Sequence, residues 1–258
     1  MCLVCFSYSA KPPYRLLLAA NRDEFFARLS LPIHIRDTEV TIIAGKDLRA
    51  GGTWLGVNQK GKMAAITNYR DPGRNLPFAP SRGELVDHYL KSEASAAEFC
   101  EQLSEKAHLY NGFNLILLDE QNCLYFSSIK NEWQYLQPGV YALSNNLLDV
   151  PWPKVKRIKE LFVHVLDSQP LDTDYESLFS ILADTEQPED YDLPDTGVGL
   201  EWERLLGTIF ICGTQYGTRS SSVMSISDTG EIVFIEKTFH NPLYKRKTSS
   251  ISFRLNIL

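Results

Sequence analysis

The chain begins MCLVCF (residues 1–6), and this stretch decides the fold together with LAANRDEF (residues 18–25). Each contains an apolar run of strand-like character, and SAKPP (residues 9–13) between them supplies the prolines of a turn. The two stretches therefore predict a β-hairpin. The second strand would bring its polar end, Asn21 to Glu24, beside Cys2. The other motifs bear on what Cys2 does there.

Length and composition favour one domain over residues 1–258 in a reducing compartment. The chain is 44% hydrophobic and 22% charged, which is ordinary for a globular protein. A net charge of −6 argues against nucleic acid as a partner, because a phosphate-binding surface needs a basic excess. The five cysteines lack disulfide spacing, no signal peptide is visible, and no apolar run is long enough to cross a membrane. We expect a cytoplasmic protein without an integral membrane segment. The sequence predicts no oligomeric state.

Strand-like segments occur towards both ends of the chain, and helix-like segments lie in the middle. TWLGVN (residues 53–58) and KMAAITNY (residues 62–69) flank a turn and predict a second hairpin. Ser81 and Glu84 have the spacing of a capping box, which predicts a helix start. Helices are predicted over residues 82–92, 95–110, 151–168 and 175–185. We expect the terminal strands to share one α+β domain, with two sheets and the helices packed outside.

One segment, residues 161–200, contains ten Asp or Glu and no Lys or Arg. An acidic lid over a site would have this composition. A solvated helix and loop has it too, and is the commoner explanation of a charge run. We therefore expect an acidic helix-loop segment on the surface.

Cys2 would become the first residue of the chain if Met1 were removed, as generally happens before a small residue. Its thiol and its α-amine would then have pKa values of about 8.5 and about 7.7–8, both close to neutral pH. The amine can take the thiol proton, and the thiolate can attack an amide or a thioester to form an acyl-enzyme. The alternative is that Cys2 is only a small apolar strand residue.

Cys5 forms a C-x-x-C pair with Cys2, which raises the question of a metal or redox site. Zinc would need a second ligand pair of similar spacing, and the sequence contains none. An offset of three residues along a strand also places the two sulfurs on opposite faces. We predict no metal site, a core position for Cys5, and a separate role for Cys2.

Several polar residues are candidates to act with Cys2. In Asn21-Arg22-Asp23-Glu24 an acid can hold the α-ammonium group and the arginine can favour the thiolate. The residues facing Cys2 are either Asn21 with Asp23 or Arg22 with Glu24. An asparagine at a strand end can donate to an oxyanion, and the candidates of this kind are Asn68, Asn145 and Asn146. Arg219, at the start of a late strand, is a further candidate.

Taken together, these motifs resemble the NRDE-motif family of transport and Golgi organisation proteins. The match runs in order from residue 1 to about residue 240. Its landmarks are MCLVCF, LAANRDEF, GGTWLGVN, ITNYR, RGELV, YNGFNLI, YALSNNLLD, PWPK and YGTRSSSV. A more distant similarity is to N-terminal-nucleophile hydrolases of the bile salt hydrolase and penicillin V acylase type. It rests on the Met-Cys start and on VNQKGKMAAITNY and LSNNLLDVPW.

This resemblance implies a four-layer αββα sandwich and a hydrolase of amide or thioester bonds with Cys2 as nucleophile. It places Asn68 and either Asn145 or Asn146 near the oxyanion, with Arg219 close by. The chain departs from the distant family at one point. That family has Arg-Asn-x-Asp, whereas here Arg22 and Asp23 are adjacent and point to opposite faces of a regular strand. We predict a strand-end twist that brings both to the thiol.

The resemblance also implies an alternative function, because NRDE-family members have been linked to haem and to acyl or lipid homeostasis. A non-catalytic carrier on the same fold would bind haem or an acyl ligand. Neither the hydrolase nor the carrier is expected to require a cofactor. Histidine is a common haem ligand. The five histidines are scattered along the sequence: His34, His88, His108, His164 and His240.

The expected partner is a small-molecule or acyl substrate, with haem as the alternative ligand. The residues expected to bind it are Asn21, Glu24, Trp54, Tyr69 and Trp152. Phe25 and the last three of these would form an aromatic cluster at the pocket, suited to an apolar ligand.

Overall fold

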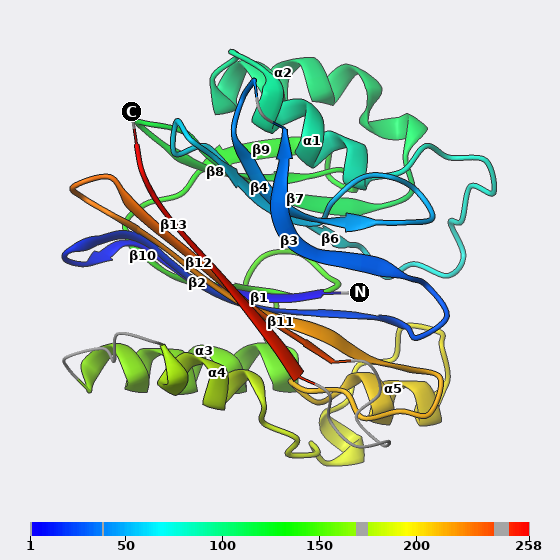
Figure 1. Ribbon diagram of the computed structural model, residues 1–258. Coiled ribbons are helices and arrows are strands. Elements are labelled where there is room, and N and C mark those ends of the chain that lie inside the picture. The colour runs from blue at the N-terminus through cyan, green and yellow to red at the C-terminus, as the bar shows by residue number, and fades with distance from the viewer. Residues whose placement is uncertain (1, 38, 169–174, 240–247, 258) are drawn as a thin grey trace.

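The computed structural model describes residues 2–37, 39–168, 175–239 and 248–257, and it has four layers (Figure 1). Two antiparallel sheets are stacked face to face in the middle, and helices cover the outer face of each sheet. The expected αββα sandwich is confirmed.

The two sheets differ in how their strands are ordered along the chain. The first sheet has the order β10 (Gly139–Leu143), β1 (Cys2–Lys11), β2 (Tyr14–Phe25), β11 (Tyr216–Ser227), β12 (Glu231–Phe239), β13 (Thr248–Asn256). The second follows chain order: β3 (Ser30–Asp37), β4 (Ile42–Asp47), β5 (Leu55–Asn58), β6 (Met63–Asn68), β7 (Phe113–Leu118), β8 (Cys123–Ser127), β9 (Glu132–Tyr135). Both expected hairpins, β1–β2 and β5–β6, are present. The structure places strands from both ends of the chain in the same sheet.

Helices α1 (Gly83–Lys91) and α2 (Ala96–Lys106) pack on the second sheet, and α3 (Pro153–Asp167) and α4 (Glu176–Leu182) pack on the first. The remaining helical elements are η1 (Ala107–Leu109), η2 (Asp190–Asp192) and α5 (Leu200–Leu206). The acidic segment 161–200 thus comprises the end of α3, α4, η2 and the start of α5, and its residues 169–174 lie outside the described residues. No described helix is long and apolar enough to cross a membrane.

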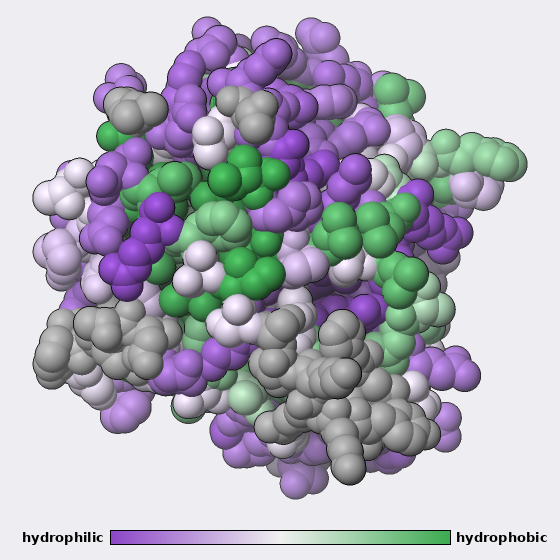
Figure 2. All heavy atoms as spheres, in the orientation of Figure 1, coloured by the Kyte–Doolittle hydropathy of each residue, from purple (hydrophilic) through white to green (hydrophobic). Residues whose placement is uncertain are grey.

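β1 is buried on both faces, which explains its unbroken apolar run. Val4 and Phe6 pack into the core between the two sheets, whereas Leu3 and Cys5 pack against α3 and α4. Burying a side chain of this size contributes about 1.5–3 kcal/mol to stability. Figure 2 shows apolar side chains gathered across the middle of this face, below the polar surface of α1 and α2.

The capping box expected at Ser81 and Glu84 is wrong. Arg82 occupies the position before α1 without a side-chain cap, and the Glu84 carboxylate accepts a hydrogen bond from the Tyr110 hydroxyl at 2.7 Å. A capping box is formed instead at α2, by Ser95 and Glu98. The Glu84 side chain bonds to Tyr110 and not to the start of the helix, so the sequence spacing alone was not sufficient to predict a capping box.

Candidate functional site

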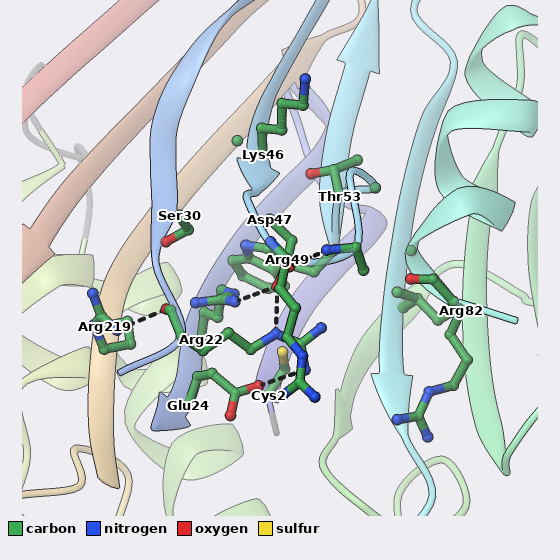
Figure 3. A pocket seen from close by; sticks show the side chains of 18 of the residues that line it. Cys2, Arg22, Glu24, Ser30, Lys46, Asp47, Arg49, Thr53, Arg82 and Arg219 are labelled. Carbon is green, nitrogen blue, oxygen red and sulfur yellow. Dashed lines mark hydrogen bonds and ion pairs between the residues drawn. The ribbon is translucent and has the colours of Figure 1, made fainter. Parts of the chain in front are cut away.

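A cavity of about 780 Å³ opens at the end of the two sheets where β1 begins (Figure 3). One wall is formed by the ends of β1 and β2 with parts of β11 and β12. The other wall is formed by β3, β4 and the loop before β5, and the segment that leads into α1 closes the side. Cys2 lies in this pocket with several of the residues that the sequence analysis singled out: Arg22, Asp23, Glu24, Trp54, Asn68 and Arg219.

The β1–β2 hairpin positions the thiol. Cys2 pairs directly with Arg22 across the two strands, so the two residues share the face that turns toward the second sheet. Cys2 is only 7% exposed, and burial raises the pKa of its thiol to about 11. The thiol is therefore protonated at neutral pH, and its reaction requires a base that removes the proton.

Asp47, at the end of β4, organises the arginines around the thiol. One of its carboxylate oxygens accepts from Arg22 at 3.2 Å and from Arg28 at 2.7 Å. The other accepts the backbone N–H groups of Arg49 and Ala50 at 3.0 and 2.9 Å. Although burial raises the pKa of Asp47, these hydrogen bonds and the two arginines hold it below its usual value. Asp47 is thus a fixed negative charge that ties β2 to β4.

Asp23 lies on the opposite face of β2 from Arg22 but still reaches the pocket. Its carboxylate accepts a hydrogen bond from the Thr218 hydroxyl at 2.8 Å, and its carbonyl accepts one from Tyr216 at 3.0 Å. Burial raises the pKa of Asp23, and the nearby Lys154 of α3 opposes this. Arg22 and Asp23 therefore both line the pocket, from two sides of one strand.

An irregularity in β11 accompanies this arrangement. Thr218 pairs with Asp23 and Ser220 pairs with Arg22, so Arg219 is an extra residue in the register. Its guanidinium donates to the carbonyls of Phe25, Phe26 and Arg28, at 3.1 Å each. Arg219 thus holds the turn that follows β2 and stands at the edge of the pocket (Figure 3).

The three candidate asparagines have different surroundings. Asn68, at the end of β6, lines the pocket. Asn145 is fully buried, and its side-chain amide donates to the Asn68 carbonyl at 3.0 Å. The Asn146 side chain accepts the Leu147 backbone N–H at 2.7 Å. Of the three, the structure brings only Asn68 to the pocket lining, while Asn145 supports it from behind.

Of the residues expected to bind substrate, Glu24 and Trp54 line the pocket, whereas Asn21, Tyr69 and Trp152 do not. The Asn21 side chain is fully buried, and donates to the carbonyls of Leu182 and Ile209 at 2.9 Å each.

The expected aromatic cluster is not assembled at the pocket. Phe25 packs edge-on against Trp202 and Tyr216, and the Arg70 guanidinium stacks on Trp152. Trp54 is the one member of the cluster that the described pocket lining contains.

Several charged residues of the pocket were not expected from the sequence: Arg28, Lys46, Asp47 and Arg49 on the second wall, Arg82 and Glu84 at the start of α1, and Glu236 on β12. The segment GKDLRAGG (residues 45–52) carries a usable signal, because two glycines follow a charged run. Gly52 lies so close to α1 that a Cβ on it would come within 2.5 Å of the Gly83 backbone. Only glycine permits the loop to approach the helix start in this way.

Candidate haem ligands are few among the residues that line the pocket. The described ranges contain no group of three or more His, Cys, Asp or Glu side chains placed to hold a metal ion. Within the described pocket lining, Cys2 is the one side chain of a type that commonly ligates haem iron, and burial disfavours its thiolate. Met1 and His240 lie outside the described residues.

Comparisons with known proteins agree with this architecture. The N-acylethanolamine-hydrolyzing acid amidase ortholog of Caenorhabditis elegans has a TM-score of 0.51 and 13% identity, covering 86% of this chain and 92% of that chain. A mutant of the conjugated bile acid hydrolase from Clostridium perfringens has a TM-score of 0.45 and 12% identity, over 96% and 92% of the two chains. The likeness to the Caenorhabditis elegans protein shows a shared fold, the αββα sandwich that the resemblance to N-terminal-nucleophile hydrolases implied.

Sequence relatives are closer. The Transport and Golgi organization 2 homolog of Mus musculus is 36% identical over 260 residues, which is 92% of this chain and 93% of the mouse protein. The homolog of Bos taurus is 34% identical over 99% of both chains. The family described as Transport and Golgi organisation 2 matches residues 1–241. This chain therefore belongs to the Transport and Golgi organisation 2 family.

Proposed function

We propose that this protein is an N-terminal-cysteine hydrolase of amide or thioester bonds, with Cys2 as nucleophile after removal of Met1. The observation that carries this proposal is the position of Cys2. It lies at the start of β1, directly across from Arg22, in a cavity that Asn68 also lines.

The neutral thiol specifies how the nucleophile would be activated. Because burial raises the pKa of Cys2 to about 11, the surroundings alone do not generate the thiolate. Removal of Met1 would place an α-amine, with a pKa of about 7.7–8, on the same residue. That amine takes the thiol proton as sulfur attacks the carbonyl carbon, and then gives it to the leaving amine or thiol. Water hydrolyses the resulting thioester and regenerates Cys2.

Neighbouring residues would assist this sequence. Asp23, buried beneath the start of β1, stabilises the α-ammonium group that forms during attack. Arg22, held by Asp47, stabilises negative charge developing on sulfur. The Asn68 side chain donates to the oxyanion, and Asn145 keeps Asn68 in place through its hydrogen bond to the Asn68 carbonyl.

The test uses protein with its native start and two chromogenic probes, neutral butyryl-4-nitroanilide and anionic succinyl-4-nitroanilide. Intact mass should show loss of Met1, and a peptide map should show an acyl adduct on Cys2 during turnover. The change Cys2→Ala should abolish both the adduct and the release of nitroaniline. The matched control is Cys212→Ala, because Cys212 is the exposed thiol of the chain and does not line the pocket.

A second variant tests the role of the α-amine. Insertion of leucine between Met1 and Cys2 blocks methionine removal and leaves the thiol in the chain. Acylation should fall by about 10²-fold or more, which is the usual contribution of a positioned base. If the wild-type protein retains Met1, or if it acylates no faster than the insertion variant, the proposal is wrong.

A non-catalytic haem carrier on the same fold is the second proposal, and it makes a different prediction. Titration with haemin should give a stoichiometric Soret band that Cys2→Ala shifts or removes, since Cys2 is the candidate ligand type in the described pocket lining. A weak band that is unchanged in Cys2→Ala argues against it.

A further inference from the structure

The pocket beside Cys2 concentrates positive charge in a chain whose net charge is −6. Six cationic side chains line it: Arg22, Arg28, Lys46, Arg49, Arg82 and Arg219. They come from β2, β4, β11 and the loops between, so folding gathers them from distant parts of the sequence. Figure 3 shows Arg82 and Arg219 on opposite sides of Cys2 and Arg22.

The carboxylates of the pocket offset only part of this charge. Asp47 accepts from both Arg22 and Arg28, and Glu24 forms a longer ion pair with Arg28 at 3.6 Å. Glu236 accepts the backbone N–H of Ile33 at 3.0 Å, and burial raises its pKa, so it is less readily ionised. Glu84 accepts from the Tyr110 hydroxyl at 2.7 Å, and Asp23 accepts from the Thr218 hydroxyl at 2.8 Å. The lining thus contains five carboxylates against six cationic side chains, and its ion pairs go to Arg22 and Arg28.

Arg82 and Arg219 have only neutral acceptors among the described residues. Arg82 donates to the Gly112 carbonyl at 2.9 Å, and Arg219 donates to three carbonyls. No ion pair joins either one to a carboxylate within the described ranges. A carbonyl satisfies an N–H group but does not neutralise the guanidinium charge.

Two further observations show that this charge is costly to the protein alone. Burial lowers the pKa of both Arg82 and Arg219, and neighbouring arginines lower it further, Arg28 in one case and Arg22 in the other. Arg22 is only 8% exposed, and one of its terminal nitrogens has no hydrogen-bond partner in the described structure. Buried guanidinium groups are normally paired. The unpaired nitrogen of Arg22 therefore indicates that a ligand with hydrogen-bond acceptors binds here.

We propose that the substrate of this site carries an oxyanionic group, a carboxylate, sulfonate or phosphate, which the pocket arginines Arg22, Arg82 and Arg219 recognise. The planar guanidinium matches such groups geometrically and binds them through charge-assisted hydrogen bonds. The scissile carbonyl then lies at Cys2 with the anionic group beside it. That the ligand is a substrate rests on the proposed function. The anion selectivity itself can be measured without turnover.

The experiment alkylates the thiols with two reagents of nearly equal size, anionic iodoacetate and neutral iodoacetamide. Mass spectrometry follows Cys2 and Cys212 in the same molecules, and Cys212, which is exposed, serves as the internal reference. The iodoacetate-to-iodoacetamide rate ratio at Cys2 should exceed that at Cys212 by about tenfold at low ionic strength, because local positive charge attracts the anion. Equal ratios at the two thiols overturn the proposal.

A double variant connects this selectivity to the two arginines. Arg82→Gln with Arg219→Gln should bring the Cys2 ratio to within about twofold of the Cys212 ratio. The matched control is Arg204→Gln with Arg254→Gln, which removes the same charge from exposed side chains outside the pocket. A loss of selectivity in both double variants would assign the effect to net charge and contradict the proposal.

Equilibrium binding covers the case in which Cys2 reacts with neither reagent. Inorganic phosphate should then raise the Tm of the wild-type protein and of the control double variant, relative to chloride at equal ionic strength. The rise should be clearly smaller in the Arg82→Gln, Arg219→Gln protein. Equal rises in both double variants reflect general salt stabilisation and overturn the proposal.

These outcomes separate the two proposals. A protein that selects anions but forms no acyl adduct on Cys2 has the arginine site without the hydrolase chemistry. A protein that forms the adduct from the neutral and anionic anilides equally fast, with equal alkylation ratios, has the chemistry without the selectivity.

Discussion

Cys2 and Cys5 lie three residues apart in one strand and have different environments. The Cys2 side chain lines the pocket, whereas Cys5 packs against α3, with its sulfur 4.0 Å from the Ile158 carbonyl. Burial raises the pKa of Cys5 well above its usual value. The alternation of side chains along a strand explains this difference, and it favours separate roles for the two thiols.

Lys154 is a residue whose protonation should depend on folding. It is 3% exposed, and burial lowers its pKa from 10.5 to about 8. Between these values the unfolded chain binds more protons than the folded one, so this lysine makes the free energy of unfolding rise with pH from about 8 to 10.5. We expect Lys154→Met to flatten that rise by roughly 1 kcal/mol per pH unit, as measured by urea unfolding.

The control for this prediction is Lys156→Met on the exposed side of the same helix. Its pH profile should follow that of the wild-type protein. Parallel profiles for all three proteins would show that Lys154 is charged in the folded state up to its usual pKa.

Asn21 should act through stability rather than through direct contact with substrate. Besides donating to two carbonyls, its side chain accepts from the Ser221 hydroxyl at 2.6 Å. Asn21→Ala removes three buried hydrogen bonds and leaves their partners unsatisfied, which should cost about 3 kcal/mol in unfolding free energy. Gln134→Ala, at an exposed position of β9, should cost under about 0.5 kcal/mol. A stable Asn21→Ala protein with a raised KM would instead support the substrate-binding role.

At the level of elements, the start of α2 is fixed by its own side chains and the start of α1 by its surroundings. Ser95 accepts the Glu98 backbone N–H, and Glu98 accepts the Ser95 backbone N–H at 2.8 Å. Ser81 makes no such cap at α1, where Gly83 accepts the Thr53 backbone N–H at 3.2 Å. The two starts have similar sequence spacing but different structural support.

This difference gives a paired prediction. Ser95→Ala should lower the free energy of unfolding by about 1 kcal/mol, the typical value of an N-cap. Ser81→Ala should change it by less than about 0.5 kcal/mol, as expected for a position without a capping contact. Thermal unfolding of the two variants side by side provides the measurement, and equal losses would contradict the assignment of the caps.

The extra residue in β11 is the element-level feature that shapes the site. In a regular strand Thr218 and Ser220 would point to the same face. With Arg219 inserted in the register, Thr218 bonds to Asp23 on the helix side while Ser220 lines the pocket. Because of this irregularity, β11 contacts Asp23 on the helix side of β2 and also places Ser220 in the pocket on the other side.

For the whole molecule, the pairing of β2 with β11 joins the two ends of the chain. β11 pairs along β2 from Tyr14 to Phe25, and β12 and β13 extend the sheet from there. We expect a chain ending at residue 212 to lose cooperative unfolding in circular dichroism and to aggregate, because β2 becomes a long apolar edge. A chain ending at residue 247 loses only the outermost strand and should stay folded, with reduced stability. Cooperative unfolding of the shorter chain would contradict this.

The sequence predicted elements better than it predicted contacts. The hairpins and the four main helices follow from periodicity and turn residues. The aromatic cluster and the Ser81 cap were wrong, because distant packing partners decide where Phe25, Trp152 and Glu84 point. Of the three arginines proposed to bind the anion, Arg22 and Arg219 were expected at the site and Arg82 was not, because the three lie in separate segments of the chain.

By itself, the sequence determined the layered fold and the separation of Cys2 from Cys5, because hydrophobic alternation and strand parity are local properties of the chain. Only the tertiary structure decided what surrounds the thiol. It placed Asp47 between Arg22 and Arg28, inserted Arg219 into the register of β11, and brought Arg82 to the same pocket. Those contacts join residues far apart in sequence, and their positions depend on how two sheets and a helix meet.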